Sequence, residues 1–401
     1  MAPEDSAAPG GTGLSTRLGW VSFFNDASGE AITRALPLLL TGGLGATPAF
    51  VGAVEGLAEA VAIGLKAVSG WASDRMATRK PLVAGGYVLS FLAKLLYLAG
   101  AWPLLFGGAR VLDRVGKGLR GAPRDAMVAD AAAAGRLGRD FGITRMLDTA
   151  GAVAGLGLAV ALGLGAGAMD LPAFRAVVLW ALPAGLVSVL LVLLWIPPLP
   201  RATTTKPLAW GLPKEIRGFL AVALLFGLAS SSDAFLVLRA REVGFGFREI
   251  LVLLVAFNLL GALLALPVGH LSDRFGRVPF LAAGWAVYAA TYACMGLAGG
   301  KAAFAAALLA YGAFYGLTEG VEKALLGDLL LPEHRGLGYG SLQMALGLAA
   351  LVASLAMGWM MAAWGSRAAF LATAGVALAS TLLLLAWSAL RRRPASPAPP
   401  R

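Results

Sequence analysis

Ionisable residues stand inside segments of this sequence that are otherwise apolar. Asp26, Glu30 and Arg34 follow one another at spacings of four residues in the first such segment. In a helix this spacing places the three side chains on one face. A charged side chain at the centre of a bilayer costs about 2.5–3.5 kcal/mol, so such a stripe is kept only where it is paired or lines water. The pattern therefore predicts a polar pathway through a membrane.

Later apolar segments carry charges of the same kind. The residues predicted to line a central cavity are Asp26, Glu30, Arg34, Arg110, Asp233, Glu319, Glu322 and Lys323. Glu30 with Arg34, and Glu319 with Lys323, are four residues apart, so simple neutralisation within a helix is the alternative for these pairs. The two histidines are expected in loops, so any transported proton must be carried by carboxylates. Protonation of a carboxylate would free its cation to bind an anionic solute, or the carboxylate itself would exchange a cation for a proton.

Other kinds of chemistry find little support in the sequence. The single cysteine, Cys294, lies inside an apolar run, and no cluster of metal ligands or phosphate-binding loop is present in the sequence. We therefore predict neither an enzyme nor an ATP-driven pump, and no cofactor or metal.

The composition requires lipid as a solvent. Hydrophobic residues make up 58% of the 401 residues and charged residues only 14%, with a mean hydropathy of +0.76. A bilayer core of about 30 Å needs about 20 residues per helix. Runs that are apolar on every face favour helices over the alternating strands of a membrane barrel. The predicted helices are 18–41, 48–70, 81–100, 103–123, 143–165, 172–195, 217–239, 249–270, 279–298, 302–327, 338–362 and 368–390.

This pattern predicts an all-α membrane protein of twelve transmembrane helices in two six-helix bundles. The bundles are expected at 18–195 and 215–390, joined by a polar linker at 196–214 that is rich in proline and threonine. The ends, 1–17 and 391–401, are expected to be cytosolic tails. The first of these lacks the basic and apolar regions of a signal peptide.

The placement of Lys and Arg predicts the orientation. Most of them fall in loops that are cytosolic when both termini are inside, which follows the positive-inside rule. The same asymmetry explains the net charge of +11 without a nucleic-acid partner. Lys66 lies near the inner end of its helix, where its side chain is expected to extend toward the lipid head groups.

A short motif occurs at the same place in both halves. Gly70-x-x-Ser73-Asp74-Arg75 follows the second predicted helix, and Gly269-x-x-Ser272-Asp273-Arg274 follows the eighth. Such repetition indicates a duplicated unit, and in duplicated transporters the substrate path lies between the two copies.

The chain resembles the major facilitator superfamily over essentially its whole length. The resemblance rests on the loop motif Gly-x-x-x-Asp-Arg-x-Gly-Arg-Arg, although Ala77 and Thr78 replace a Gly and an Arg in the first copy. It implies a latch in which Asp74 accepts hydrogen bonds from the amino terminus of a neighbouring helix and arginines pair with carboxylates. The predicted gating residues are Asp74, Arg75, Arg79, Asp113, Arg114, Asp273, Arg274 and Arg277.

The resemblance also bears on direction and coupling. Arg110 matches an arginine that many proton-coupled members carry within the fourth helix. Gly142, Gly151 and Gly155 match a pattern of exporters, but Leu156 stands where a proline is expected. We therefore predict a monomeric transporter of the cytoplasmic membrane that exports a small solute in exchange for protons. The alternatives are proton-coupled uptake, uniport, a lipid flippase and a membrane sensor.

Overall fold

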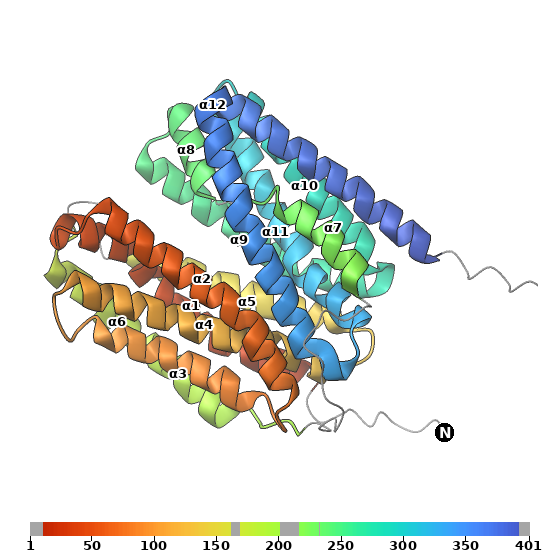
Figure 1. Ribbon diagram of the computed structural model, residues 1–401, viewed down its shortest axis with the longest axis horizontal. Coiled ribbons are helices and arrows are strands. Elements are labelled where there is room, and N and C mark those ends of the chain that lie inside the picture. The colour runs from red at the N-terminus through yellow and green to blue at the C-terminus, as the bar shows by residue number, and fades with distance from the viewer. Residues whose placement is uncertain (1–10, 162–168, 201–215, 232, 393–401) are drawn as a thin grey trace, which may run out of the picture.

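The structure, a computed structural model, describes residues 11–161, 169–200, 216–231 and 233–392 (Figure 1). Regular secondary structure in these ranges is helical. The first half contains α1 (Gly11–Leu38), α2 (Pro48–Asp74), α3 (Lys80–Leu96), α4 (Pro103–Ala131), α5 (Leu137–Ala161) and α6 (Leu171–Leu190). The second half contains α7 (Arg217–Gly227), α8 (Ala234–Glu242), α9 (Phe247–Phe275), α10 (Arg277–Leu297), α11 (Lys301–Leu329) and α12 (Arg335–Arg392).

These labels correspond to twelve spans. The helices α7 and α8 are the two pieces of one broken span. The long helix α12 is two spans, because the backbone at Gly365 has φ of 80° and bends the chain there. A positive φ of this kind is readily adopted by glycine alone. The expectation of an all-α protein of twelve spans in two bundles is therefore confirmed.

Helix ends follow local chemistry. The side chain of Thr47 accepts a hydrogen bond from the backbone N–H of Phe50 (3.2 Å), and Pro48 begins α2. The carboxylate of Asp170 likewise accepts from the N–H of Ala173 (2.9 Å) at the start of α6. Such caps satisfy donors that a helix start leaves unpaired.

Some boundaries differ from the prediction. Helix α1 begins at Gly11 and not at 18, and α4 continues through Pro123 to Ala131. The predicted helix at 217–239 is interrupted after Gly227, where glycine and the following serines are poor helix formers. The hydroxyl of Tyr288 donates to the carbonyl of Ala229 (2.7 Å) and satisfies a group freed by this break. The predicted linker and tails lie mostly outside the described residues.

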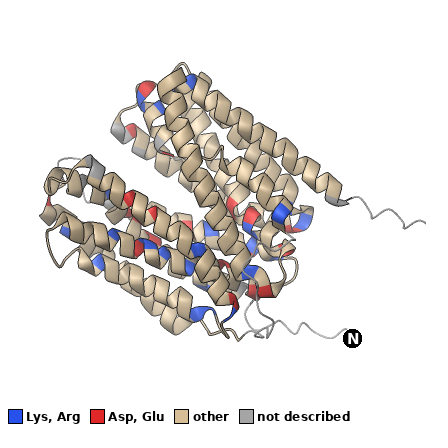
Figure 2. Ribbon diagram, viewed as in Figure 1, with Lys and Arg blue, Asp and Glu red and all other residues tan. Residues whose placement is uncertain are grey.

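The helices pack through apolar cores, and charged side chains gather between the two bundles. Five segments of the described chain are long and apolar enough to cross a membrane by composition alone, and they include α9, α10 and α11. Helix α12 carries almost no charge along its length (Figure 2). The charged residues concentrate on helices such as α1, α4 and α11 that face the other bundle.

Glycines bring the two bundles together. Helix α5 lies against α9, and α12 lies against α2. A Cβ on Gly142 of α5 would lie only 2.6 Å from the carbonyl oxygen of Ala265 in α9. Gly70 of α2 and Gly336 of α12 approach each other in the same way, each blocking the space that a side chain on the other would need. Small residues at these crossings permit close helix contact in a membrane.

Candidate substrate cavity and the two aspartate caps

Asp74 joins the first bundle to the second. Its two carboxylate oxygens accept hydrogen bonds from the backbone N–H groups of Gly336 (2.9 Å) and Leu337 (2.7 Å), at the start of α12. Arg79 donates to the same carboxylate at 2.7 Å, and both side chains are fully buried. A carboxylate at this position also interacts favourably with the positive end of the α12 dipole. This geometry is the one that the family resemblance implied for Asp74.

Asp273 makes the equivalent contact in the opposite direction. Its carboxylate accepts hydrogen bonds from the N–H groups of Gly138 (2.8 Å) and Arg139 (2.9 Å), at the start of α5. Arg277 is paired with it at 2.5 Å. We call Asp74 and Asp273, with the helix ends that they cap, the two aspartate caps. Each cap belongs to one bundle and holds a helix of the other.

Two further carboxylates complete the caps and were missed in the sequence. Arg79 pairs with Asp130 of α4 (3.0 Å), and Arg277 pairs with Asp328 of α11 (2.9 Å). Both pairs join residues 51 positions apart. A search for acidic residues at matching distances from the repeated motif would have found them.

The remaining predicted gating residues have other contacts. Arg75 stacks on the ring of Trp71, with its guanidinium carbon 3.7 Å from the ring centroid. Arg114 lies 4.0 Å from Glu59, and Asp113 lies 3.8 Å from Arg110. Asp113 and Arg114 thus lie near charged residues of α4 and α2 within the first bundle. Arg274 is exposed at the end of α9.

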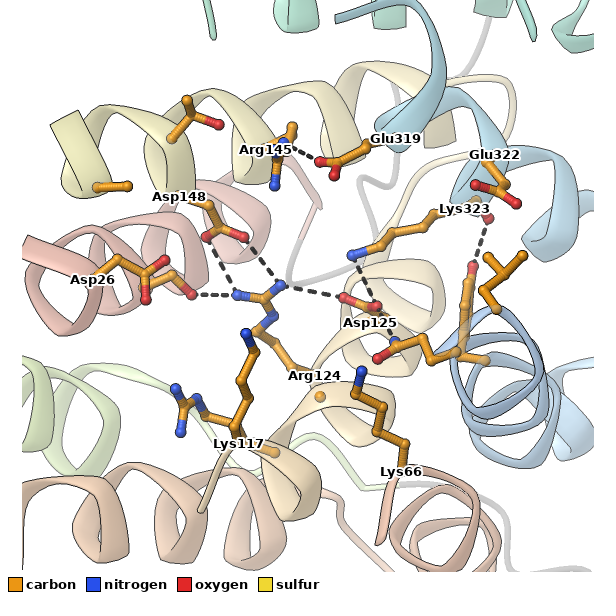
Figure 3. A pocket seen from close by; sticks show the side chains of 18 of the residues that line it. Asp26, Lys66, Lys117, Arg124, Asp125, Arg145, Asp148, Glu319, Glu322 and Lys323 are labelled. Carbon is orange, nitrogen blue, oxygen red and sulfur yellow. Dashed lines mark hydrogen bonds and ion pairs between the residues drawn. The ribbon is translucent and has the colours of Figure 1, made fainter. Parts of the chain in front are cut away.

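A cavity of about 430 Å³ lies between the bundles, next to the caps (Figure 3). Residues of both bundles line it, from α1, α2, α4 and α5 on one side and α9, α11 and α12 on the other. Its charged lining residues are Asp26, Lys66, Lys117, Arg120, Arg124, Asp125, Arg145, Asp148, Glu319, Glu322 and Lys323. Its volume suits a small solute, since ligand sites commonly enclose about 300–1,000 Å³.

Half of the predicted cavity set lies in this cavity. Asp26 of α1 lines it, as do Glu319, Glu322 and Lys323 of α11. The other four predicted residues, Glu30, Arg34, Arg110 and Asp233, are not among its lining residues.

Those four residues lie in separate contacts. Glu30 and Arg34 form the intrahelical pair at 2.8 Å that was the simpler explanation of their spacing. Arg110 makes a bidentate contact with Glu55, with both N–O distances 2.9 Å. Asp233 accepts hydrogen bonds from tyrosine hydroxyls of α11 at 3.2–3.3 Å.

The intrahelical alternative fails for Glu319 and Lys323. Glu319 pairs with Arg145 of α5, and Lys323 pairs with Asp125 of α4 at 3.0 Å. Gln343 of α12 also donates to Asp125, at 2.7 Å. Each of the two residues therefore forms its ion pair with a residue of the first bundle and not with the other one. These contacts, like the caps, connect one bundle to the other.

The charged residues of α4 were misplaced by the sequence prediction. The predicted helix 103–123 contained Arg120 and ended before Arg124 and Asp125, and none of the three was predicted to line the cavity. The helix continues, and the side chains of all three face the cavity. Arg124 reaches Asp148 of α5 at 3.1 Å. This pair lies within the first bundle and lines the cavity.

Lys66 also differs from the prediction. Its side chain lines the cavity in company with Lys117 and does not extend to the lipid surface. Helical position alone did not show which face of α2 meets the other bundle.

The fold and the site define a multi-pass membrane transporter. The family model of the Major Facilitator Superfamily matches residues 18–248 and 218–401, and the chain belongs to this superfamily. Members of this superfamily are transporters and not enzymes.

Relatives agree with this assignment. The chain is 32% identical over 383 residues to an uncharacterised MFS-type transporter of Methanocaldococcus jannaschii, which covers 92% of this chain and 93% of the relative. The structure resembles that of a human organic anion transporter, with a TM-score of 0.79, 15% identity and coverage of 92% and 98% of the two chains. It also resembles a proton:xylose symporter, with a TM-score of 0.77, 16% identity and 94% coverage of both. At these identities the two structural likenesses show the fold alone.

Proposed function

We propose that this protein exports a small solute across the cytoplasmic membrane in exchange for protons, by alternating access. The observation that carries the proposal is the charged cavity between two bundles that are joined at one end by two polar caps. A membrane-embedded cavity of this polarity is expensive to maintain and indicates a pathway. A transporter must expose it to each side in turn.

The contacts between the bundles suit a reversible change. The caps and the pairs Arg145–Glu319 and Lys323–Asp125 are hydrogen bonds and ion pairs between rigid helices. Such contacts can break together when one bundle rocks against the other. The free energies of the two access states must lie within a few kcal/mol of each other for the transporter to cycle. Each contact that stabilises one state therefore changes the ratio of the two populations.

We place the caps on the cytosolic side, with both termini also cytosolic, because the motif loops carry the basic residues that the positive-inside rule assigns there. The described conformation is then closed to the cytosol. Helices of both bundles of one chain line the cavity, which supports a monomer as the transporting unit.

Glu322 is our candidate for the coupling carboxylate. Among the described residues, its carboxylate has no ion pair or hydrogen bond, although it lines the cavity. A carboxylate without a fixed partner can exchange a proton without first breaking a contact. Asp26 and Glu319, which have polar partners, would respond to the same proton. A proton:xylose symporter has a similar fold, which supports the proposal of proton coupling.

Export is supported by the glycine pattern of α5. The support is the resemblance of Gly142, Gly151 and Gly155 to the pattern of exporters. Uptake with protons remains the competing reading, and the experiment below separates them.

The test uses purified protein in liposomes of equal internal and external pH that contain a pH-sensitive dye. Pools of metabolites and drugs are added outside. Antiport moves protons outward as solute enters, whereas symport moves them inward. Protein-free liposomes are the control. Proton outflow that is absent in Glu322→Gln supports the proposal, whereas solute entry without proton movement, or lipid transfer between leaflets in its place, contradicts it.

A further inference from the structure

Two lysines face the cavity from the first bundle without a fixed partner. Lys66 of α2 and Lys117 of α4 point into it near Arg124 (Figure 3). In the described part of the chain, neither ammonium group has an ion pair within 4.0 Å or a hydrogen bond. The function proposed above assigns no role to either residue.

The charges of the cavity lining do not balance around these lysines. The lining contains six basic and five acidic side chains. Three acidic residues, Asp125, Asp148 and Glu319, are already in ion pairs with Lys323, Arg124 and Arg145. These pairs leave Asp26 and Glu322 among the acidic side chains, and Arg120 and the two lysines among the basic ones.

Arg120 is held by other contacts. Its guanidinium donates to the hydroxyl of Ser90 (2.7 Å) and lies over the ring of Tyr87, 4.7 Å from the centroid. The two lysines have no comparable contact. They are therefore the cations of this cavity that remain available to a ligand.

The two lysines also repel each other. Lys117 experiences the positive charge of Arg114 most strongly and that of Lys66 as well, while Asp26 and Glu59 attract it only from beyond ion-pair distance. Like charges held together in a membrane-embedded site are unfavourable unless an opposite charge accompanies them. A bound anion would remove this repulsion and gain charge-assisted hydrogen bonds from both ammonium groups.

We infer that Lys66 and Lys117 form an anion subsite that binds a carboxylate or phosphate group of the transported solute. This inference rests on the proposed transport function and narrows its substrate to a small organic anion. The remaining polar lining, including Gln343, would contact the rest of the molecule. An anion here would bind the side chain of a residue whose backbone packs against Gly340 of α12. Its binding would therefore bear on the contact between the bundles.

The test measures binding in detergent, where no gradient exists. The apparent unfolding temperature is followed by tryptophan fluorescence at constant ionic strength, with phosphate, succinate and citrate as probes and glucose and tetramethylammonium as neutral and cationic comparisons. We expect the anions to raise it in a saturable manner. Lys66→Gln and Lys117→Gln should each require at least about tenfold more anion for half of the shift.

Lys301→Gln is the matched control, because Lys301 is an exposed lysine paired with Glu249 outside the cavity. It should respond to anions as the wild type does. A shift that is equal in all four proteins, or absent with every anion, overturns the inference. This test measures binding and not transport. Its result is therefore independent of the liposome assay that tests the proposed function.

A second arm identifies the source of the anion. The protein is placed in nanodiscs of phosphatidylcholine, with and without phosphatidylglycerol. If phosphatidylglycerol abolishes the phosphate effect in the wild type, a lipid head group occupies the subsite, and the free-solute part of the inference is wrong. If the phosphate effect persists, the subsite serves free anions.

Discussion

Replacing Asp74 by Asn tests whether the caps set the balance between access states. The substitution keeps the size of the side chain but removes its charge. One oxygen that accepts an N–H of α12 becomes an NH₂ group, which cannot accept. Arg79 loses the closer of its two carboxylate partners. The residue is fully buried, so water cannot replace what is lost.

The size of the effect follows from these contacts. A hydrogen bond to a charged group contributes about 1.5–3 kcal/mol. Asn retains one acceptor, so we expect a net loss of about 2–3 kcal/mol from the capped conformation. This corresponds to a shift of roughly 30- to 150-fold toward the alternative state. Transport should fall, because a cycle needs both states to be populated.

The populations can be measured directly with spin labels. Cysteines at Ala77 and Leu331, which are exposed on opposite sides of the Asp74 cap, carry the labels in a Cys294→Ser background. Electron–electron distance measurements should show a longer distance gaining population in Asp74→Asn. Asp170→Asn is the control, because Asp170 caps α6 within one bundle. Unchanged distances together with normal transport in Asp74→Asn would refute the reasoning.

Three further outcomes are expected. Glu322→Gln should abolish transport driven by a pH gradient but retain solute exchange, since exchange needs no net proton cycle; gradient-driven transport at the wild-type rate would exclude this residue. Gly70→Ala should destabilise the capped conformation by about 1–3 kcal/mol through contact with the backbone of α12, whereas Gly64→Ala, which has open space, should not, as the same distance measurement would show. The pKa of Glu249 is lowered by the backbone N–H at the start of its helix and by Lys301, so its stabilising contribution is present at neutral pH and lost as pH falls through that value. Glu249→Gln should therefore unfold at a lower temperature than the wild type at pH 7 and match it at about pH 3; an equal difference at both pH values would contradict this.

Much of the fold could be predicted because membrane helices are long apolar runs that are visible in the sequence. The number of spans and the duplication followed from apolar run lengths and the repeated motif. The break between α7 and α8 could not be predicted, because it depends on Tyr288 of another helix to satisfy a freed carbonyl. The predicted end of the fourth helix at residue 123 was too early, because α4 continues through Pro123 to Ala131.

The site was harder to predict than the fold. A charge in an apolar run shows that a polar partner exists, but the sequence does not say whether that partner is in the same helix. Spacing was right for Glu30 with Arg34 and wrong for Glu319 with Lys323, whose partners come from the facing bundle. Lys66 was assigned to the lipid head groups and Lys117 was not predicted to line the cavity, because helix faces, and not helix ends, decide what lines a cavity.

The reciprocity of the caps has a consequence for how the protein opens. Asp74 holds α12, and the corresponding residue Asp273 holds α5. This is the contact pattern of a symmetric dimer, in which one surface patch meets its complement twice about a two-fold axis. The two caps share no residue, because one joins α2 to α12 and the other joins α9 to α5. The bundles can separate at this end only when both caps are broken. Loss of one cap should therefore destabilise the closed state less than loss of both.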